Sequence, residues 1–345
     1  MWRPATRKAG RHVLTERRYN MKQYIIRRIL ISFVVLFGVS VMMYTLVRLM
    51  PADYVTLSTS KRTNITEDMR QQLRKLYGLD KGIAAGYIAW AGQAIRGDFG
   101  TSLVFRKPVT TVIKEYAPIT FTLAFLSLVF EILIAIPLGI TAARKQYEFT
   151  DYLIVTIVFI GISVPIFFLA SILKRGFGYY GLNILPMSGM LTARVNYTGF
   201  TFAKLIDYMR HLILPIFCFV FTSAGGWLRF TRTNMLEVLN TDYVRTARAK
   251  GVPERGVIYS HAFRNTLIPL VTIIGGSLPG LFSGATITEQ LFGIAGLGNI
   301  AYRVTFLSDV PYLMGFNMFL ALMTIIGYLL SDILYAVVDP RIRLS

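Results

Sequence analysis

The sequence predicts an all-helical membrane protein with six transmembrane helices, and three observations support this fold class. Hydrophobic residues make up 54% of the 345 residues and charged residues only 16%, whereas soluble domains average about 25% charged residues. Six segments are apolar over close to the roughly 20 helical residues that cross a hydrocarbon core. The net charge of +19 could also indicate nucleic-acid binding. The long apolar segments instead favour basic residues that lie beside lipid and on cytoplasmic loops.

The six predicted spans cover residues 29–47, 119–143, 153–173, 212–228, 267–287 and 313–338. The first is too long for a cleavable signal peptide, and residues 44–50 offer no small-residue cleavage site. Residues 1–28 form a basic arm, expected to be disordered over its first 20 residues, with nine basic residues and one acid. Such a block stays in the cytoplasm, so with six spans both termini and the segments 144–151 and 229–266 are also cytoplasmic.

The first helix, within residues 29–50, is followed by a long extracytoplasmic loop at 51–118 that is expected to be folded. Thr66 can cap a helix that carries Glu67 and Asp68 in its first turn, and Gly78 can end it. A second helix is expected over 83–95, before a turn at 97–100 with the sequence Gly-Asp-Phe-Gly. The loop is either a lid or docking element, which we favour because long ordered loops are usually functional, or a passive spacer.

The segment 236–266 interrupts the membrane core of residues 119–345 with a basic stretch. Asp242 can act as an N-cap, Gly251 suits a left-handed helix terminus, and Pro253 suits a first helical position. The pattern therefore predicts two short helices joined at residues 251–252, outside the bilayer. The sequence pattern alone supports an alternative equally well, in which this segment is a charged cytoplasmic loop that only joins two spans.

This stretch resembles the EAA loop of ABC-transporter permeases, in the form found in dipeptide and oligopeptide permease subunits of the B type. The general pattern is Glu-Ala-Ala, three residues, Gly, nine residues, Ile, one residue and Leu-Pro. Aligned on Gly251, the chain departs from the pattern at both ends: residues 245–247 are Arg-Thr-Ala in place of Glu-Ala-Ala, and His261 and Arg264 replace the Ile and the Pro. The segments 245–251, 261–265 and 267–269 are similar to the peptide-permease version. So are 48–51, 97–100, 231–236, 296–298 and 339–343, although Ala52-Asp53 replaces the more usual Gly-Asp.

The resemblance implies an ATP-driven importer of the bacterial or archaeal cytoplasmic membrane. This chain would be its non-catalytic permease subunit. It would pair with a second homologous permease, two cytoplasmic ATPase subunits that bind ATP and Mg, and an extracytoplasmic substrate-binding protein. The residues that it implies for ATPase coupling are Asp242, Arg245, Thr246, Ala247, Arg248, Lys250, Gly251, His261 and Arg264.

The chain itself shows no signature of a bound cofactor or metal. It contains no Gly-x-x-x-x-Gly-Lys-Ser/Thr loop, so hydrolysis must come from another polypeptide. The single cysteine and three widely separated histidines form no readable ligand cluster. The resemblance implies di- or oligopeptides as the cargo. Nickel-chelate and glutathione remain alternatives within the class, and a proton-coupled secondary transporter is an alternative outside it.

Three residues are candidates for the substrate path. Glu131 lies in the middle of the second span, where a charge costs about 2.5–3.5 kcal/mol, so it either binds a cationic group of the substrate or hydrogen-bonds within a permease interface. Pro165 and Pro279 are expected to kink their spans and shape the cavity. The glycines of the second, third and fifth spans are expected to allow close helix packing. Glu289 and Asp332 are expected to be structural.

Overall fold

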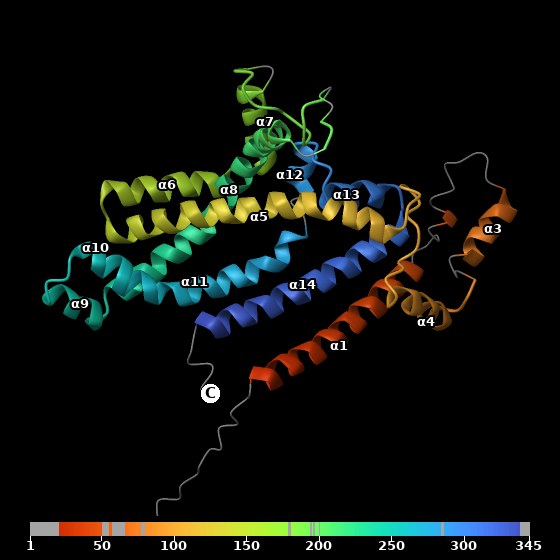
Figure 1. Ribbon diagram of the computed structural model, residues 1–345, viewed down its shortest axis with the longest axis horizontal. Coiled ribbons are helices and arrows are strands. Elements are labelled where there is room, and N and C mark those ends of the chain that lie inside the picture. The colour runs from red at the N-terminus through yellow and green to blue at the C-terminus, as the bar shows by residue number, and fades with distance from the viewer. Residues whose placement is uncertain are drawn as a thin grey trace, which may run out of the picture.

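The computed structural model describes residues 21–49, 55–56, 66–76, 80–178, 181–193, 195, 197–199, 201–283 and 286–338. These residues are helical apart from turns, loops and one isolated antiparallel bridge between Thr101 and Pro108. Figure 1 shows the long helices side by side in one bundle, with α9 and α10 at one end and α3 and α4 at the other. The all-helical fold class is confirmed for the described residues.

Four helices are long and apolar enough to cross a membrane by themselves. They are α1 (Met21–Arg48), α5 (Val109–Arg144), α8 (Phe202–Leu239) and α14 (Val310–Val338). Two further candidates are bent pairs. Helices α6 (Phe149–Ser163) and α7 (Ile166–Phe177) meet at 101°, and the helical stretches Glu254–Leu267 and Pro269–Leu281 meet at 45°. The described residues thus hold four candidate spans, or up to six if each bent pair counts as one.

The helices extend beyond the apolar segments that predicted them. Helix α1 begins eight residues before the predicted span, α5 ten residues before and α8 ten residues before. The fifth predicted span is shorter in the structure, because α11 (Arg264–Ser277) passes into a 3-10 turn, η2 (Leu278–Leu281), before α12 (Thr286–Leu291). The length of an apolar segment reflects the thickness of the hydrocarbon core that it crosses. The helix itself can continue on either side into polar surroundings.

Glycines bring α5, α6 and α8 into close contact, as expected for small residues between membrane helices. A Cβ atom on Gly139 would lie 2.8 Å from Cβ of Thr231 and 2.9 Å from the carbonyl oxygen of Leu228. On Gly161 it would collide with the carbonyl oxygen of Phe221. The expectation of close packing at these two glycines is therefore confirmed.

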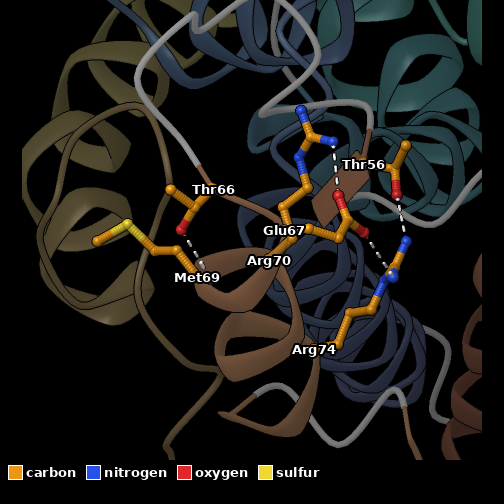
Figure 2. Close-up of polar contacts among 6 residues, drawn as sticks. All are labelled: Thr56, Thr66, Glu67, Met69, Arg70 and Arg74. Carbon is orange, nitrogen blue, oxygen red and sulfur yellow. Dashed lines mark hydrogen bonds and ion pairs between the residues drawn. The ribbon is translucent and has the colours of Figure 1, made fainter.

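The loop after α1 contains the two helices that the sequence predicts, α3 (Glu67–Leu76) and α4 (Ile83–Ala94). The side chain of Thr66 accepts a 3.4 Å hydrogen bond from the Met69 amide, and Glu67 forms ion pairs with Arg70 and Arg74 at 2.9 and 3.7 Å (Figure 2). The expected Thr66 cap is confirmed, while Gly78 and the dipeptide at 52–53 lie outside the described residues. In the 97–100 turn, Gly100 donates its amide to Oδ1 of Asp98 at 2.9 Å.

Helix α4 packs on α1 through an aromatic cluster. The ring of Tyr44 lies 5.7 Å from Tyr87 and 5.8 Å from Trp90, and the Tyr87 hydroxyl hydrogen-bonds Ser40 at 2.8 Å. These contacts fix the loop against the end of the first membrane helix.

Two buried carboxylates hold this same end of the bundle together. Glu289 of α12 accepts hydrogen bonds from the Thr120 hydroxyl and from the Asn299 amide, both at 2.8 Å, and so caps α13 (Leu297–Phe306). Asp309 accepts from the Ser102 hydroxyl at 2.5 Å and from the Val104 amide at 3.0 Å. The structural role expected for Glu289 agrees with this geometry. The Gly-Leu-Gly motif at 296–298 leaves room for the carboxylate, because a Cβ on its first glycine would collide with it.

Candidate coupling site

The basic stretch forms helix α9 (Asp242–Ala249), which lies at the end of the bundle between α8 and the start of the fifth candidate span (Figure 1). Its inner face is apolar. Val244 and Ala247 are buried in a cluster with Met235 of α8, Ile140 of α5 and Ile258 from the segment that follows α9. Burial of a side chain such as Val244 stabilises the contact by roughly 1.5–3 kcal/mol, so α9 is fixed to the bundle by its inner face.

The start of α9 differs by one residue from the prediction. Asp242 is the first helical residue, Thr241 occupies the N-cap position, and neither provides a side-chain cap. Asp242 is placed in the first turn, where a carboxylate interacts favourably with the helix dipole. It lies 3.6 Å from Arg245, and the two side chains are 99% and 68% exposed, so this ion pair contributes little. The Thr246 hydroxyl donates back to the Asp242 carbonyl at 2.8 Å.

The end of α9 is a closed Schellman motif. The amide of Gly251 donates to the carbonyl of Arg248 at 3.0 Å, and the amide of Val252 donates to the carbonyl of Ala247 at 3.2 Å. Gly251 has φ +78°, a conformation that costs residues with a side chain about 1–2 kcal/mol. The predicted left-handed terminus at Gly251 is therefore confirmed.

Arg248 forms an ion pair within the same segment of the chain. Its Nη2 and Nε donate to the two carboxylate oxygens of Glu254 at 2.9 and 3.2 Å, across the corner formed by Gly251. These hydrogen bonds raise the pKa of the Arg248 guanidinium. Of the implied coupling cations, Arg245, Lys250 and Arg264 are exposed, as is His261. Their contact with an ATPase stays a prediction.

The second predicted helix is continuous with the fifth candidate span. Pro253 occupies the N-cap position of α10 (Glu254–Gly256), one residue earlier than predicted. The chain then forms a π-helix, η1 (Val257–Phe263), which leads directly into α11. Segments of π-helix are rare and frequently mark functional positions. Residues 254–277 therefore form one continuous helical segment.

Two polar contacts in this region were missed by the sequence reasoning. The Asn265 side chain donates to the Tyr243 hydroxyl at 2.8 Å and so joins α11 to α9. Arg232 of α8 forms a two-pronged ion pair with the buried Asp151 of α6 at 2.9 and 2.8 Å. The Arg248–Glu254 pair was also missed, although two opposite charges six residues apart across a predicted corner were a signal that could have indicated it. Arg232 and Asp151 are 81 residues apart, and the sequence contains no signal that pairs them.

The three substrate-path candidates contact different parts of the structure. Glu131 is 4% exposed, and its Oε2 accepts a 3.0 Å hydrogen bond from the Trp227 indole between α5 and α8. Its Oε1 has no hydrogen-bond partner among the described residues. Pro165 lies at the 101° break, and Pro279 packs against Gly327 of α14. The expected kink at Pro165 is confirmed, and the roles of all three in a substrate path stay predictions.

A groove of about 560 Å³ runs along α5 and α8, but none of the three candidates lines it. Its walls are apolar except for Arg210, whose guanidinium donates to the Ile184 carbonyl at 2.9 Å. Among the described residues, no group of three or more His, Cys, Asp or Glu side chains could hold a metal ion.

The sequence matches two family descriptions that together cover nearly the whole chain. Residues 135–344 match the binding-protein-dependent transport system inner membrane component, and residues 21–124 match the N-terminal part of such a membrane component. The chain belongs to this family. The permease is thus a non-catalytic, multi-pass component of the inner membrane.

Curated relatives of this permease align over at least 99% of their own length. The oligopeptide transport system permease protein AppB of Bacillus subtilis is 37% identical over 324 residues, which is 94% of this chain and 100% of the relative. The dipeptide transport system permease protein DppB of Escherichia coli (strain K12) is 33% identical over 341 residues, 94% of this chain and 99% of the relative. A putative peptide permease protein of Brucella ovis is 33% identical over 330 residues, with 94% and 100% covered.

Proposed function

We propose that this permease forms the translocation path of an ATP-driven peptide importer, and that α9 receives the movement of separate ATPase subunits. The observation that carries the proposal is that α10, η1 and α11 form one continuous helix from Glu254 to Ser277, and that the hydrogen-bonded corner at Gly251 joins the exposed basic helix α9 to its start. A rigid connection transmits displacement, whereas a flexible loop absorbs it. Membership of the binding-protein-dependent transport family supports the assignment to importers of this class.

The topology that we propose has six spans, with each bent pair counted as one, and both termini in the cytoplasm. Helix α9 then lies on the cytoplasmic side. The ion pair between Arg28 near the start of α1 and Asp332 near the end of α14, at 3.2 Å, supports this arrangement because it places both at the same face. The loop with α3 and α4 is then extracytoplasmic, where it forms a lid or docking element.

The complex that we propose contains a second homologous permease, two cytoplasmic ATPases and an extracytoplasmic binding protein. The ATPases bind ATP and Mg, and this chain binds no cofactor. The description of the family as dependent on a binding protein supports the last of these partners. The exposed cations of the coupling site, Arg245, Lys250 and Arg264, provide donors for acidic or carbonyl groups of an ATPase.

The proposed cargo is a di- or oligopeptide, because relatives aligned over at least 99% of their own length are named for oligopeptides and dipeptides. The test is reconstitution of the four kinds of subunit in vesicles, followed by uptake of labelled dipeptides and pentapeptides with and without ATP. Uptake that requires ATP and the binding protein is expected. If only nickel-chelate or glutathione is taken up, the proposed peptide cargo is wrong. If a proton gradient drives uptake without ATP, the assignment to ATP-driven importers is wrong.

Glu131 is proposed as a residue of the substrate path. Its burial against Trp227 means that a cationic group of the substrate reaches it only when α5 and α8 separate during transport. The Glu131→Gln variant is expected to lose uptake of cationic peptides while it retains uptake of neutral ones. Wild-type uptake of every peptide at every pH tested would remove Glu131 from the path.

Gly251→Val tests the coupling role directly. Valine at φ +78° is strained, so the corner is expected to open and ATP hydrolysis is expected to continue with less uptake per ATP. Unchanged uptake per ATP, in a complex that assembles normally, would contradict a coupling role for this corner.

A further inference from the structure

Helix α9 is held at three places, which are its buried face and the two edges of that face. Its inner face is buried through Val244 and Ala247. At one edge of this face, four residues after Val244, Arg248 is bound to Glu254 beyond the Gly251 corner. At the other edge, four residues before Ala247, Tyr243 is bound to Asn265 at the start of α11. A helix that is bound along its inner face and at both edges of that face resists both rotation about its axis and separation from its neighbours.

The Arg248–Glu254 pair has the geometry of the strongest exposed ion pairs. Both nitrogens of one edge of the guanidinium face both carboxylate oxygens, which fixes direction as well as distance. The two side chains are about half exposed, at 43% and 52%. An exposed pair of ordinary geometry contributes little, but two-pronged pairs with low mobility are the exception.

We infer that Arg248 and Glu254 are positioning residues that clamp α9 to α10, with Tyr243 and Asn265 as a second clamp, so that residues 242–267 move as one rigid lever. This inference rests on the proposed function of α9. It assigns the Arg248 charge to a bond within the chain, whereas the resemblance implied contact with an ATPase. It also assigns roles to Glu254, Tyr243 and Asn265, which sequence reasoning did not select.

The first test is hydrogen exchange of the α9 amides in the assembled complex, which needs no transport activity. Glu254→Ala is expected to speed exchange in 242–249 roughly two- to fivefold, as the loss of a well-formed exposed pair implies. Glu148→Ala is the matched control, because Glu148 likewise pairs with a basic residue at a turn, Lys145 at 3.7 Å, yet belongs to neither clamp. Equal exchange in Glu254→Ala and in wild type would overturn the clamp, even in a complex that does not transport.

The second test is uptake per ATP hydrolysed in the reconstituted complex, which a merely structural pair would leave unchanged. Arg248→Ala and Glu254→Ala are each expected to lower this ratio by a similar factor. The double variant is expected to be no worse than either one, and the exchange R248E/E254R is expected to recover part of the ratio. If Arg248→Ala lowers the ratio and Glu254→Ala does not, Arg248 acts on the partner and the inference is wrong.

The second clamp has its own conservative variant. Tyr243→Phe removes only the hydroxyl that accepts from Asn265 and keeps the ring. A lower uptake per ATP, with normal assembly and normal ATP binding by the partners, is expected. A wild-type ratio in this variant would limit the lever to the Arg248–Glu254 clamp and would contradict the inclusion of α11. Absence of ATP-driven uptake in the wild-type complex would instead contradict the proposed function.

Discussion

The ion pair between Asp151 and Arg232 provides the sharpest test of how the permease is held together. Asp151 lies in the first turn of α6 and its side chain is 4% exposed, whereas that of Arg232 on α8 is 25% exposed. The two donated hydrogen bonds measure 2.9 and 2.8 Å, and the Tyr147 amide adds a third at 3.1 Å. The pair therefore joins the turn between α5 and α6 to the end of α8.

The two single substitutions differ in what they leave behind. Arg232→Ala leaves a buried carboxylate with only the Tyr147 amide, and broken buried pairs cost about 3–5 kcal/mol. Because Arg232 is one quarter exposed, water recovers part of this, and we expect a loss of about 3 kcal/mol in the free energy of unfolding. Asp151→Ala leaves an arginine that can turn towards solvent, so its cost is about 1–2 kcal/mol, near that of a hydrogen bond to a charged group.

The assay is equilibrium unfolding of the purified permease in mixed micelles, followed by circular dichroism. The double variant D151A/R232A is expected to be more stable than Arg232→Ala alone, since it removes the stranded charge. Glu148→Ala breaks an exposed pair in the same turn and is expected to cost less than about 1 kcal/mol. A cost for Arg232→Ala no larger than that of Glu148→Ala would refute the reasoning, as would a double variant that is additive.

Four other predictions follow from packing and buried hydrogen bonds. Gly161→Val places a side chain against a backbone carbonyl of α8, so it should destabilise by about 1–3 kcal/mol in the same unfolding assay. Gly92→Ala, with open space around it in α4, should be neutral or stabilising by up to about 1 kcal/mol. Glu289→Ala leaves a hydroxyl and an amide unsatisfied, and should cost about 2–4 kcal/mol, visible as lower thermal stability. Asp309→Asn should loosen the segment that begins at Ser102, measured as faster proteolysis there; unchanged cleavage would contradict the tether.

Local features of this fold could be predicted because one physical effect dominates each of them. The apolar segments indicate membrane helices since hydrocarbon excludes unpaired backbone groups. Gly251 indicates a left-handed corner because other residues are strained there, and Thr66 indicates a helix start because its hydroxyl accepts a backbone amide. The break at Pro165 was also predictable, since proline lacks the amide that continues a helix.

Other features depend on distant parts of the chain and left no local signal. The angle of 101° between α6 and α7 depends on packing, and a proline fixes only where the break occurs. The burial of Glu131 depends on Trp227, 96 residues away, so its mid-span position indicated that it needed a partner but could not identify one. The π-helix at 257–263 differs from an α-helix by one residue of register, which hydrophobic periodicity does not detect.

The contacts within the lever of residues 242–267 place its flexible point away from Gly251. The Schellman bonds and the Arg248–Glu254 pair close the corner at that glycine, so its unusual conformation is a fixed angle. The second clamp ends at Asn265. The helix bends by 45° between Leu267 and Pro269, where proline removes the amide that would bond the Asn265 carbonyl. If residues 242–267 move as one body, displacement of α9 therefore changes the angle at Pro269, and the rest of the fifth span follows from there.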